Sequence, residues 1–380
     1  MGILDTLKDC GRTVKHFAGW RTSARLVAFA VDDYGSVRTA DAAARTFLRK
    51  KVPGFGGQMD EFDAMETRQD LEALFEILSR HRDDEDNSCV LTAYCLSANP
   101  DFEKIRSDRV YAYERLDRTY ARLEEKDANA YSGMQQLWRQ GMQAGVIRPQ
   151  CHGREHYCIP LVDWKLCNHA TDLEANLAVE SMAGLSSVPE LENVGFNEAF
   201  GLTDTSRIPE QALVIEDGLR RFEEQFGFAS RTFVPPAAKL NRAHDELLYK
   251  LGVLGVDVPF LEYQSYGLRS RLPRVNYLGQ VRRQIPARVV RTLSFEPCSG
   301  VKSDPVGRAL HEIGTAFAWR KPAIISSHRV NFGGYLDPAN RVRGLQRLDE
   351  LLAGIRKTWP DVQFVTVDRL VETMRQPAAH

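Results

Sequence analysis

Two adjacent carboxylates and a pair of histidines are the residues of this chain whose types and spacing best suit chemistry. Asp32 and Asp33 close the apolar run 26–31, and His152 and His156 follow about 120 residues later. Two carboxylates that leave a buried strand side by side are costly unless something positive lies between them. One aspartate with both histidines would form an open metal site. The other would remain for proton transfer, which indicates hydrolysis by a metal-activated water.

A further histidine, His328, ends the apolar run 322–327. In a parallel α/β barrel the carboxyl ends of the strands form one face, where active sites lie. Taken alone, Asp-Asp after a strand is usually a turn or helix cap, and an isolated His-x-x-x-His pair is more often surface or core histidine. The occurrence of all these residues at strand ends in one chain favours a site.

The elements that must position these residues follow from the hydrophobic pattern, in which apolar runs alternate with amphipathic stretches. The expected strands are 25–32, 89–96, 146–152, 231–236, 254–259, 289–294, 322–328 and 363–367. The expected helices are 70–80, 208–226, 238–251, 305–319 and 343–357, with Pro209, Pro305 and Pro338 where helix starts are expected. This order predicts parallel strands with crossover helices, and seven or eight units favour a barrel over an open sheet.

The domain organisation that we expect is an N-terminal extension, 1–24, followed by one (β/α) barrel domain, 25–372. A charged helical insertion is expected at about 101–145. Loop insertions are expected at about 163–205 and 260–288, near the mouth of the barrel.

Composition excludes some classes of function. The 380 residues are 43% hydrophobic and 27% charged, with a net charge of −1. These values are ordinary for a soluble enzyme and give no electrostatic case for nucleic acid. The N-terminal residues show no secretory h-region, and no run approaches the roughly 18 apolar residues of a membrane span, so a cytoplasmic protein is expected. The cysteines are then expected as reduced thiols, and the spacing of Cys151, Cys158 and Cys167 is not a usual zinc spacing.

At its candidate residues the chain resembles the polysaccharide deacetylases of carbohydrate esterase family 4, which have a deformed (β/α) barrel. The segment from Ala30 to Gly35 is similar to the family's motif Thr-Phe-Asp-Asp-Gly, with one residue inserted before the glycine. The segment from His152 to His156 matches His-(Ser/Thr)-x-x-His, with Gly153 replacing the hydroxyl residue. The resemblance spans roughly residues 25–370. The segments 326–332 and 359–362 are similar to a divergent branch of polysaccharide (de)acetylases.

This resemblance implies roles for the candidate residues. Asp33, His152 and His156 would bind a divalent metal, with zinc expected first and cobalt, nickel or iron compatible with the same ligands. Asp32 would be the general base that deprotonates the metal-bound water. His328 would be the general acid that protonates the departing amine.

The chain departs from the family at two supporting positions. Val234 stands where the family has an arginine that orients the catalytic aspartate, and Arg231 and Arg291 are candidates to replace it. The family also has an aspartate that positions the acidic histidine. Asp257 and Glu296 are the candidates for that role.

Several residues near the motifs are candidates for substrate binding or for support behind the metal ligands. The simpler interpretations are a turn for Asn99, a surface ion pair for Arg154 and a solvent-facing side chain for Glu155. The full set is Tyr34, Asn99, Arg154, Glu155, Glu296, Arg329 and Asn331.

The function that we expect is a metal-dependent hydrolase that removes an acetyl or other acyl group from an N-acetylated sugar or glycan precursor. Two alternatives stay open. One is a metal-independent barrel glycosidase that uses paired carboxylates such as Glu155 and Glu296. The other is an inactive carbohydrate-binding protein on the same fold. The sequence does not indicate an oligomeric state.

Overall fold

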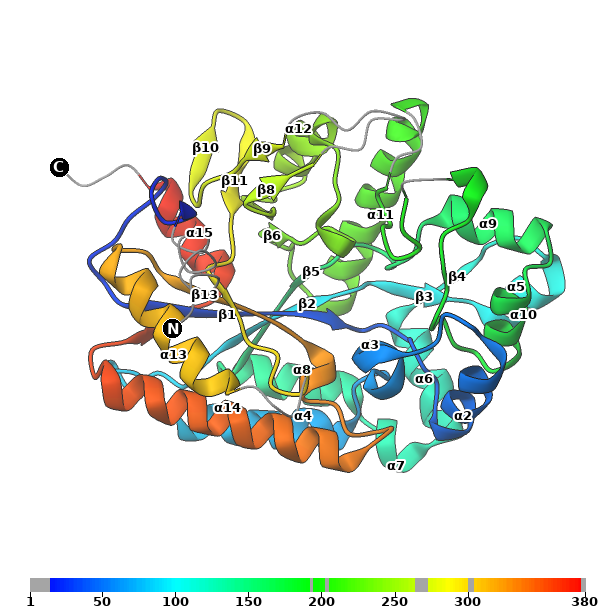
Figure 1. Cartoon of the computed structure of the whole chain (residues 1–380), viewed down its shortest axis with the longest axis horizontal. Coiled ribbons are helices and arrows are strands. Elements are labelled where there is room, and N and C mark those ends of the chain that lie inside the picture. The colour runs from blue at the N-terminus through cyan, green and yellow to red at the C-terminus, as the bar shows by residue number, and fades with distance from the viewer. Residues whose placement is uncertain (1–13, 192–193, 202–204, 264–272, 300–303, 377–380) are drawn as a thin grey trace, which may run out of the picture.

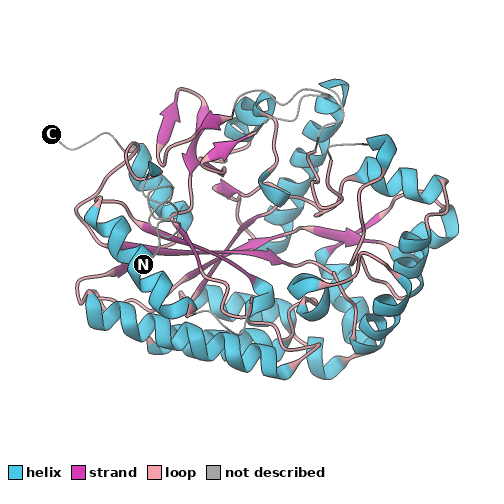
Figure 2. Cartoon of the chain, in the orientation of Figure 1, coloured by secondary structure: helices cyan, strands magenta, loops and turns pink. Residues whose placement is uncertain are grey.

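A largely parallel sheet enclosed by helices carries the candidate residues at its strand ends (Figures 1 and 2). The computed structural model describes residues 14–191, 194–201, 205–263, 273–299 and 304–376. The strands of the sheet are β1 (Leu26–Tyr34), β2 (Leu91–Cys95), β5 (Ile147–Cys151), β6 (Thr232–Phe233), β7 (Gly255–Asp257), β10 (Gln280–Arg282), β11 (Ile285–Val289), β12 (Leu293–Ser294), β13 (Ala323–His328) and β14 (Gln363–Phe364). Two short ribbons pair β3 (Ala98–Pro100) with β4 (Tyr113–Arg115) and β8 (Leu261–Glu262) with β9 (Arg274–Val275).

The strand order confirms the predicted deformed (β/α) barrel. It runs β10-β11-β7-β6-β5-β2-β1-β13-β12, with β14 also paired to β1, and every pair is parallel except β10 with β11. β11 and β12, which end the parallel run on its two sides, are joined by residues 290–292. The sheet path is therefore interrupted at this connection rather than closed by a strand pair in the described part of the chain.

β1 lies in the middle of the sheet and positions the first motif. All its residues are buried, as expected for a strand covered on both faces. Its parallel register with β13 sets Asp32 beside His328. The register of β2 with β5 pairs Cys95 with Cys151, so the chain leaves β5 at His152, close to the same level. The carboxyl ends of β13, β1 and β5 thus bring the motifs together, with β2 between β1 and β5.

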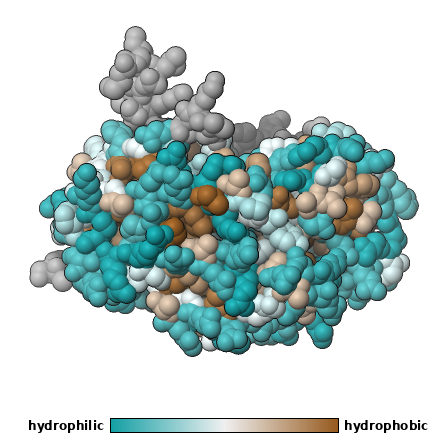
Figure 3. Space-filling model, turned by 90° about the horizontal axis from the view of Figure 1, so that it is seen from below, coloured by the Kyte–Doolittle hydropathy of each residue, from teal (hydrophilic) through white to brown (hydrophobic). Residues whose placement is uncertain are grey.

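Helices cover both flanks of the sheet, with α4, α8, α13 and α14 along one flank and α11 and α12 along the other (Figure 1). The helices are α2 (Ala42–Lys51), α3 (Gly57–Phe62), α4 (Arg68–Arg80), α5 (Phe102–Asp108), α6 (Leu116–Lys126), α7 (Ala128–Tyr131), α8 (Met134–Gln143), α9 (Ile159–Cys167), α10 (Thr171–Ala178), α11 (Ile208–Phe226), α12 (Asp245–Lys250), α13 (Pro305–Ala318), α14 (Pro338–Thr358) and α15 (Val367–Arg375). The outer face on the side of α4 and α14 is mainly hydrophilic, with hydrophobic residues in patches between polar ones (Figure 3).

α4 illustrates why these segments are helical. Thr67 and Asp70 form a capping box that satisfies backbone N–H groups of the first turn. Leu71, Leu74 and Leu78 recur at helical spacing and are buried. The prolines predicted near the starts of α11, α13 and α14 are found in their first turns. None of the helices in the described part of the chain has the length and apolar character needed to cross a bilayer.

Several predicted boundaries are wrong. The expected helix 238–251 is only α12, preceded by a 3-10 turn at Arg242–His244, because the Asn241 side chain accepts the Ala243 N–H and starts the turn there. The expected strand 289–294 is split between β11 and β12. The expected loop 163–205 contains α10 and part of α9, in which apolar residues at helical spacing are buried. The expected loop 260–288 contains β8 to β10, although its residues 264–272 lie outside the described part.

The described part of the predicted N-terminal extension is bound to the barrel through its backbone. The Lys321 ammonium donates to the carbonyl oxygens of Ala18, Gly19 and Trp20 at 2.7, 2.9 and 2.8 Å. The Trp20 N–H also donates to the Leu278 carbonyl at 2.7 Å. These contacts fix the course of the segment that follows Lys15.

A buried ionic cluster ties the end of β13 to the segment after β1. Arg329 donates to Asp63 Oδ1 from Nε and Nη2, at 3.1 and 2.8 Å, and to Glu66 Oε2 from Nη1 at 2.7 Å. Glu66 in turn accepts the Gly35 N–H and the Tyr120 hydroxyl. Because all the charged side chains in this cluster are almost fully buried, each depends on its partners for compensation.

Replacement of Arg329 tests this cluster. Arg329→Met would leave Asp63 and Glu66 buried without their cation, and we expect a loss of about 3–5 kcal/mol in the free energy of unfolding, measured by urea denaturation. The control Arg347→Met removes an exposed pair with Glu350 on α14 and should cost about 1 kcal/mol or less. Equal losses in the two variants would contradict a stabilising role for the cluster.

Candidate active site

The backbone at the end of β1 turns both aspartates of the first motif into one cavity. Neighbouring residues in a regular strand point to opposite faces of the sheet. Here the register with β2 shifts between Val31 and Tyr34, and Asp33 has a φ of 76°, in the left-handed region. Asp32 and Asp33 consequently both line the same cavity. A non-glycine residue in this conformation is strained, and such strain concentrates at functional sites.

His152 is held by backbone contacts in an orientation that frees one ring nitrogen. Its N–H donates to the Cys95 carbonyl at 2.8 Å. Its Nδ1 lies 2.8 Å from the Val234 carbonyl, which can only accept, so Nδ1 carries the proton. Its Nε2 lies 3.3 Å from Asp33 Oδ1 and would supply a lone pair to a cation bound between them. Metal-binding histidines are oriented by this kind of contact.

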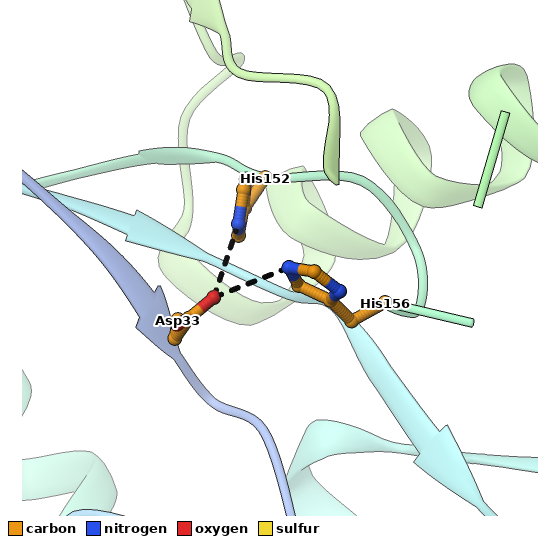
Figure 4. A group of neighbouring side chains, drawn as sticks. All are labelled: Asp33, His152 and His156. Atoms are coloured by element: carbon orange, nitrogen blue, oxygen red, sulfur yellow. Dashed lines mark hydrogen bonds and ion pairs between the residues drawn. The ribbon is translucent and has the colours of Figure 1, made fainter. Parts of the chain in front are cut away.

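His156, further along the same loop, contacts the same oxygen of Asp33. Its Nε2 also lies 3.3 Å from Asp33 Oδ1, and its ring centroid is 5.2 Å from that of His152, with the rings steeply inclined (Figure 4). Gly153, at a φ of 102°, makes the turn that returns the chain toward the site. Gly153 stands where the resembled motif has Ser or Thr, and a residue with a side chain would be strained in this backbone conformation.

The donor atoms of Asp33, His152 and His156 fit a divalent cation. All three lie within 4.8 Å of one another, and one carboxylate oxygen with two imidazole nitrogens is a common ligand set for zinc and similar metals. Burial opposes ionisation of Asp33, but its hydrogen bonds from the two histidines hold its pKa well below the usual range. A carboxylate that stays charged in a buried position is a ready ligand for a cation.

Arg291 binds the other aspartate. Its Nη1 and Nη2 donate to the two oxygens of Asp32, both at 2.7 Å, and its Nε donates to Asp257 Oδ2 at 2.8 Å. A further bond runs from Nη1 to the Ser326 hydroxyl at 2.9 Å. Arg291 comes from the connection between β11 and β12, so the interruption in the sheet supplies the arginine that contacts Asp32.

Of the two arginines proposed from the sequence, Arg291 makes this contact and Arg231 does not. The Arg231 side chain instead bonds to the Gly252 carbonyl at 3.4 Å. Asp257, a candidate to position His328, bonds to Arg291, so that interpretation is wrong. Burial raises the pKa of Asp257, and the Arg291 charge opposes this shift.

Glu296 is the side chain that contacts His328. Its Oε1 lies 2.7 Å from His328 Nδ1, and its other oxygen accepts from the Asn331 amide. Burial lowers the pKa of His328, but the hydrogen bond to Glu296, together with the charges of Asp33 and Asp32, raises it to about 9. His328 is therefore protonated at neutral pH, with Nδ1 bound and Nε2 left to the cavity.

The cavity that these residues share has a volume of about 510 Å³. Its polar floor holds the aspartates and histidines, and much of its wall is apolar. The lining is Lys15, Asp32, Asp33, Arg38, Met59, His152, His156, Asn197, Val234, Pro235, Ala237, Ala238, Asp257, Val258, Pro259, Phe260, Val290, Arg291, Ser326 and His328. Its size is in the range of small-molecule sites.

All seven candidates for substrate binding or support lie outside this lining, and five of them make contacts elsewhere in the structure. The Tyr34 ring packs edge-on against Trp138 in the core. Asn99 accepts the Val37 N–H and donates to the Gly35 carbonyl, both at 2.8 Å, so it holds the segment after β1. Arg154 and Glu155 bond to each other, at 2.6 and 3.0 Å. Arg329 belongs to the buried cluster described above. None of these five side chains lines the cavity, and each contacts other parts of the protein.

Two cations that line the cavity, Lys15 and Arg38, were missed in the sequence. Neither lies in a motif, and Lys15 belongs to the extension that was set apart from the barrel. The position of Arg38 shortly after the Asp32-Asp33 strand end was the one signal that could have identified it.

Comparison with known proteins supports the fold. No protein-family model and no curated protein matches the chain. Among solved structures, a provisionally assigned glycoside hydrolase/deacetylase from Parabacteroides distasonis gives a TM-score of 0.51 at 8% identity, over 93% of this chain and 72% of that one. A provisionally assigned polysaccharide deacetylase from Mycobacterium smegmatis gives 0.45 at 13% identity, over 94% and 93%. At these identities the likeness concerns the barrel fold alone.

Metal content tests the cluster of Asp33, His152 and His156. We expect purified protein reconstituted with zinc to retain about one equivalent after desalting, and His152→Ala to retain far less, because an open site with two ligands binds weakly. The control His81→Ala removes a histidine that bonds to Asp349 instead. Equal metal content in wild type and His152→Ala would rule out the cluster as the binding site.

Proposed function

We propose that the protein is a metal-dependent hydrolase that removes an acyl group, with acetyl as the first candidate, from an N-acylated sugar or glycan precursor. The observation that carries the proposal is the convergence of three functional groups on one cavity. These are the Asp33–His152–His156 cluster, the Arg291-bound carboxylate of Asp32 and the Glu296-bound imidazole of His328. A carbohydrate substrate is favoured because the Parabacteroides distasonis structure described above is provisionally assigned as a glycoside hydrolase/deacetylase.

The residues at the centre would divide into ligands and a base. Asp33, His152 and His156 would hold a divalent cation, which would polarise an acyl carbonyl as a Lewis acid and make water more acidic. Asp32 would accept the proton of the attacking water. Its two oxygens each keep a lone pair beyond those used by Arg291, so the arginine orients the carboxylate without blocking it.

His328 would supply the proton that the leaving amine needs. An amine is a poor leaving group until it is protonated, and an imidazolium is a suitable acid near neutral pH. Glu296 would hold the imidazolium by accepting its Nδ1–H, which directs Nε2–H toward the cavity. Asn331 supports Glu296 in turn, and Gln58 donates to Asn331 Oδ1 at 3.1 Å.

The contacts weaken the two alternatives. A glycosidase that uses Glu155 and Glu296 needs both carboxylates at one bond of the substrate. Glu155 is buried, bonded to Arg154 and absent from the cavity lining. An inactive binding protein would have no need for a base and an acid that are each held by a dedicated partner. The set of Asp32 with Arg291 and His328 with Glu296 therefore favours turnover.

Asp32→Asn separates the base from the metal ligands. We expect the variant to keep its metal, because Asp33 and both histidines remain, and to lose about 10²- to 10⁴-fold in kcat for release of acetate from an N-acetylated sugar. Asp361→Asn, at an exposed pair with Arg25, is the control. If Asp32→Asn is as active as this control, Asp32 is not the base.

Glu296→Gln tests the acid through its pH dependence. Glu296 raises the pKa of His328, so the acid form is present at neutral pH and is lost as the pH rises through the raised pKa. The uncharged glutamine should lower the pKa of His328, so the alkaline limb of the kcat profile should move to lower pH. Glu350→Gln, on the surface of α14, should leave the profile unchanged. An alkaline limb that stays in place in Glu296→Gln would exclude the proposed pairing.

A further inference from the structure

Arg38 is a cation in the wall of the cavity that the proposed chemistry does not use. The lysine and arginine residues of the lining are Lys15, Arg38 and Arg291. Arg291 is committed to Asp32 and Asp257 by three of its nitrogens. Arg38 comes from the segment that follows β1, a short distance along the chain from Asp33, and its side chain is 20% exposed.

The guanidinium of Arg38 is bound from one edge only. Its Nε and Nη2 both donate to a single oxygen, Asp60 Oδ1, at 3.0 and 2.8 Å. Among the described residues no hydrogen bond to its Nη1 is found. The Nη1 atom also is not among the fully buried polar atoms that lack a partner, so solvent can reach it. Arg38 thus offers N–H donors to the cavity.

The partner of Arg38 is itself held in place. Asp60 Oδ1 also accepts the Gly184 N–H at 3.2 Å, and Asp60 Oδ2 accepts the Gly56 N–H at 3.0 Å. The charges of Asp60, Asp63 and Asp33 all act on the guanidinium, but of these three carboxylates only Asp60 is hydrogen-bonded to it. The N–H groups of Arg38 Nη1 remain available to a further acceptor.

The backbone beneath Arg38 is fixed on both sides. The Met182 N–H donates to the Arg38 carbonyl at 2.7 Å, and the Tyr157 hydroxyl donates to the Val37 carbonyl at 2.8 Å. Asn99 accepts the Val37 N–H. A guanidinium on a fixed backbone, locked along one edge by a carboxylate, is preorganised to bind a ligand with its free edge.

We propose that Arg38 binds an anionic substituent of the substrate, a carboxylate or a phosphate, so that the preferred substrate is a negatively charged N-acylated sugar. A guanidinium presents paired donors that suit both anions, and charge-assisted bonds are stronger than those to neutral hydroxyls. The cavity volume of about 510 Å³ leaves room for a sugar with such a substituent. The identity of the sugar rests on the proposed function, whereas the anion preference is a binding property that needs no turnover.

Calorimetry with three acetylated sugars tests this preference. The probes are neutral N-acetylglucosamine, N-acetylglucosamine 6-phosphate and N-acetylmuramic acid, which carries a carboxylate. They are titrated into zinc-loaded protein with the Asp32→Asn change, which blocks turnover. We expect at least one anionic probe to bind about tenfold or more tightly than the neutral probe, the size expected of a charge-assisted bond. Which probe it is distinguishes phosphate from carboxylate.

Arg38→Gln in the same background should remove the preference and leave the affinity for N-acetylglucosamine nearly unchanged. Arg308→Gln, at an exposed arginine of a neighbouring cavity, is the control for a general loss of positive charge. A preference that survives Arg38→Gln, or equal binding of all three probes before the change, would overturn the proposal.

A crystal structure of the parent protein with the tighter anionic probe gives a second test that does not depend on the folding of Arg38→Gln. The anion should lie within hydrogen-bond distance of Arg38 Nη1, and an anion bound elsewhere would contradict the proposal. Failure of the proposed function has a different signature. Wild-type zinc-loaded protein would then release no acetate from any of the three probes, whatever their order of affinity.

Discussion

The arrangement of this site depends on separate positive partners for the negative charges of two adjacent buried carboxylates. Asp32 and Asp33 would repel each other and resist burial if they shared one environment. The positive φ at Asp33 and the shifted register of β1 lead them to different partners. Asp33 meets two imidazoles, and Asp32 meets the guanidinium of Arg291. Two chemically equal residues thereby acquire environments that suit a metal ligand and a proton acceptor.

The supporting residues come from the connections between strands rather than from the strands. Arg291 lies in the link that joins the two ends of the parallel run, and Glu296 follows β12. Arg291 contacts Asp32 at the end of β1, and Glu296 contacts His328 at the end of β13. In the resembled family the orienting arginine belongs to a local motif, whose position Val234 occupies here. An arginine from another part of the barrel can therefore contact the carboxylate at the end of β1, because the strand ends share one face.

The sequence was sufficient for the barrel and for the convergence of Asp33, His152 and His156, since each rests on a local pattern at a strand end. It was insufficient for partners set by tertiary packing. Arg291 and Glu296 were candidates among others, and only the fold distinguishes Arg291 from Arg231 and Glu296 from Asp257. Glu155 lies between the motif histidines in sequence, yet it bonds to Arg154 and does not line the cavity. Proximity along the chain does not fix the direction of a side chain.

The most direct test of the account is a titration of chelator-treated protein with zinc while acetate release from N-acetylated sugars is followed. We predict no release without metal and a rise in release that levels off near one equivalent of zinc, because one cluster would hold the ion. Hydrolysis that persists in the chelated protein would contradict the account and favour metal-independent chemistry. If the protein binds metal but releases no acetate at any metal ratio, the proposed removal of an acetyl group is wrong.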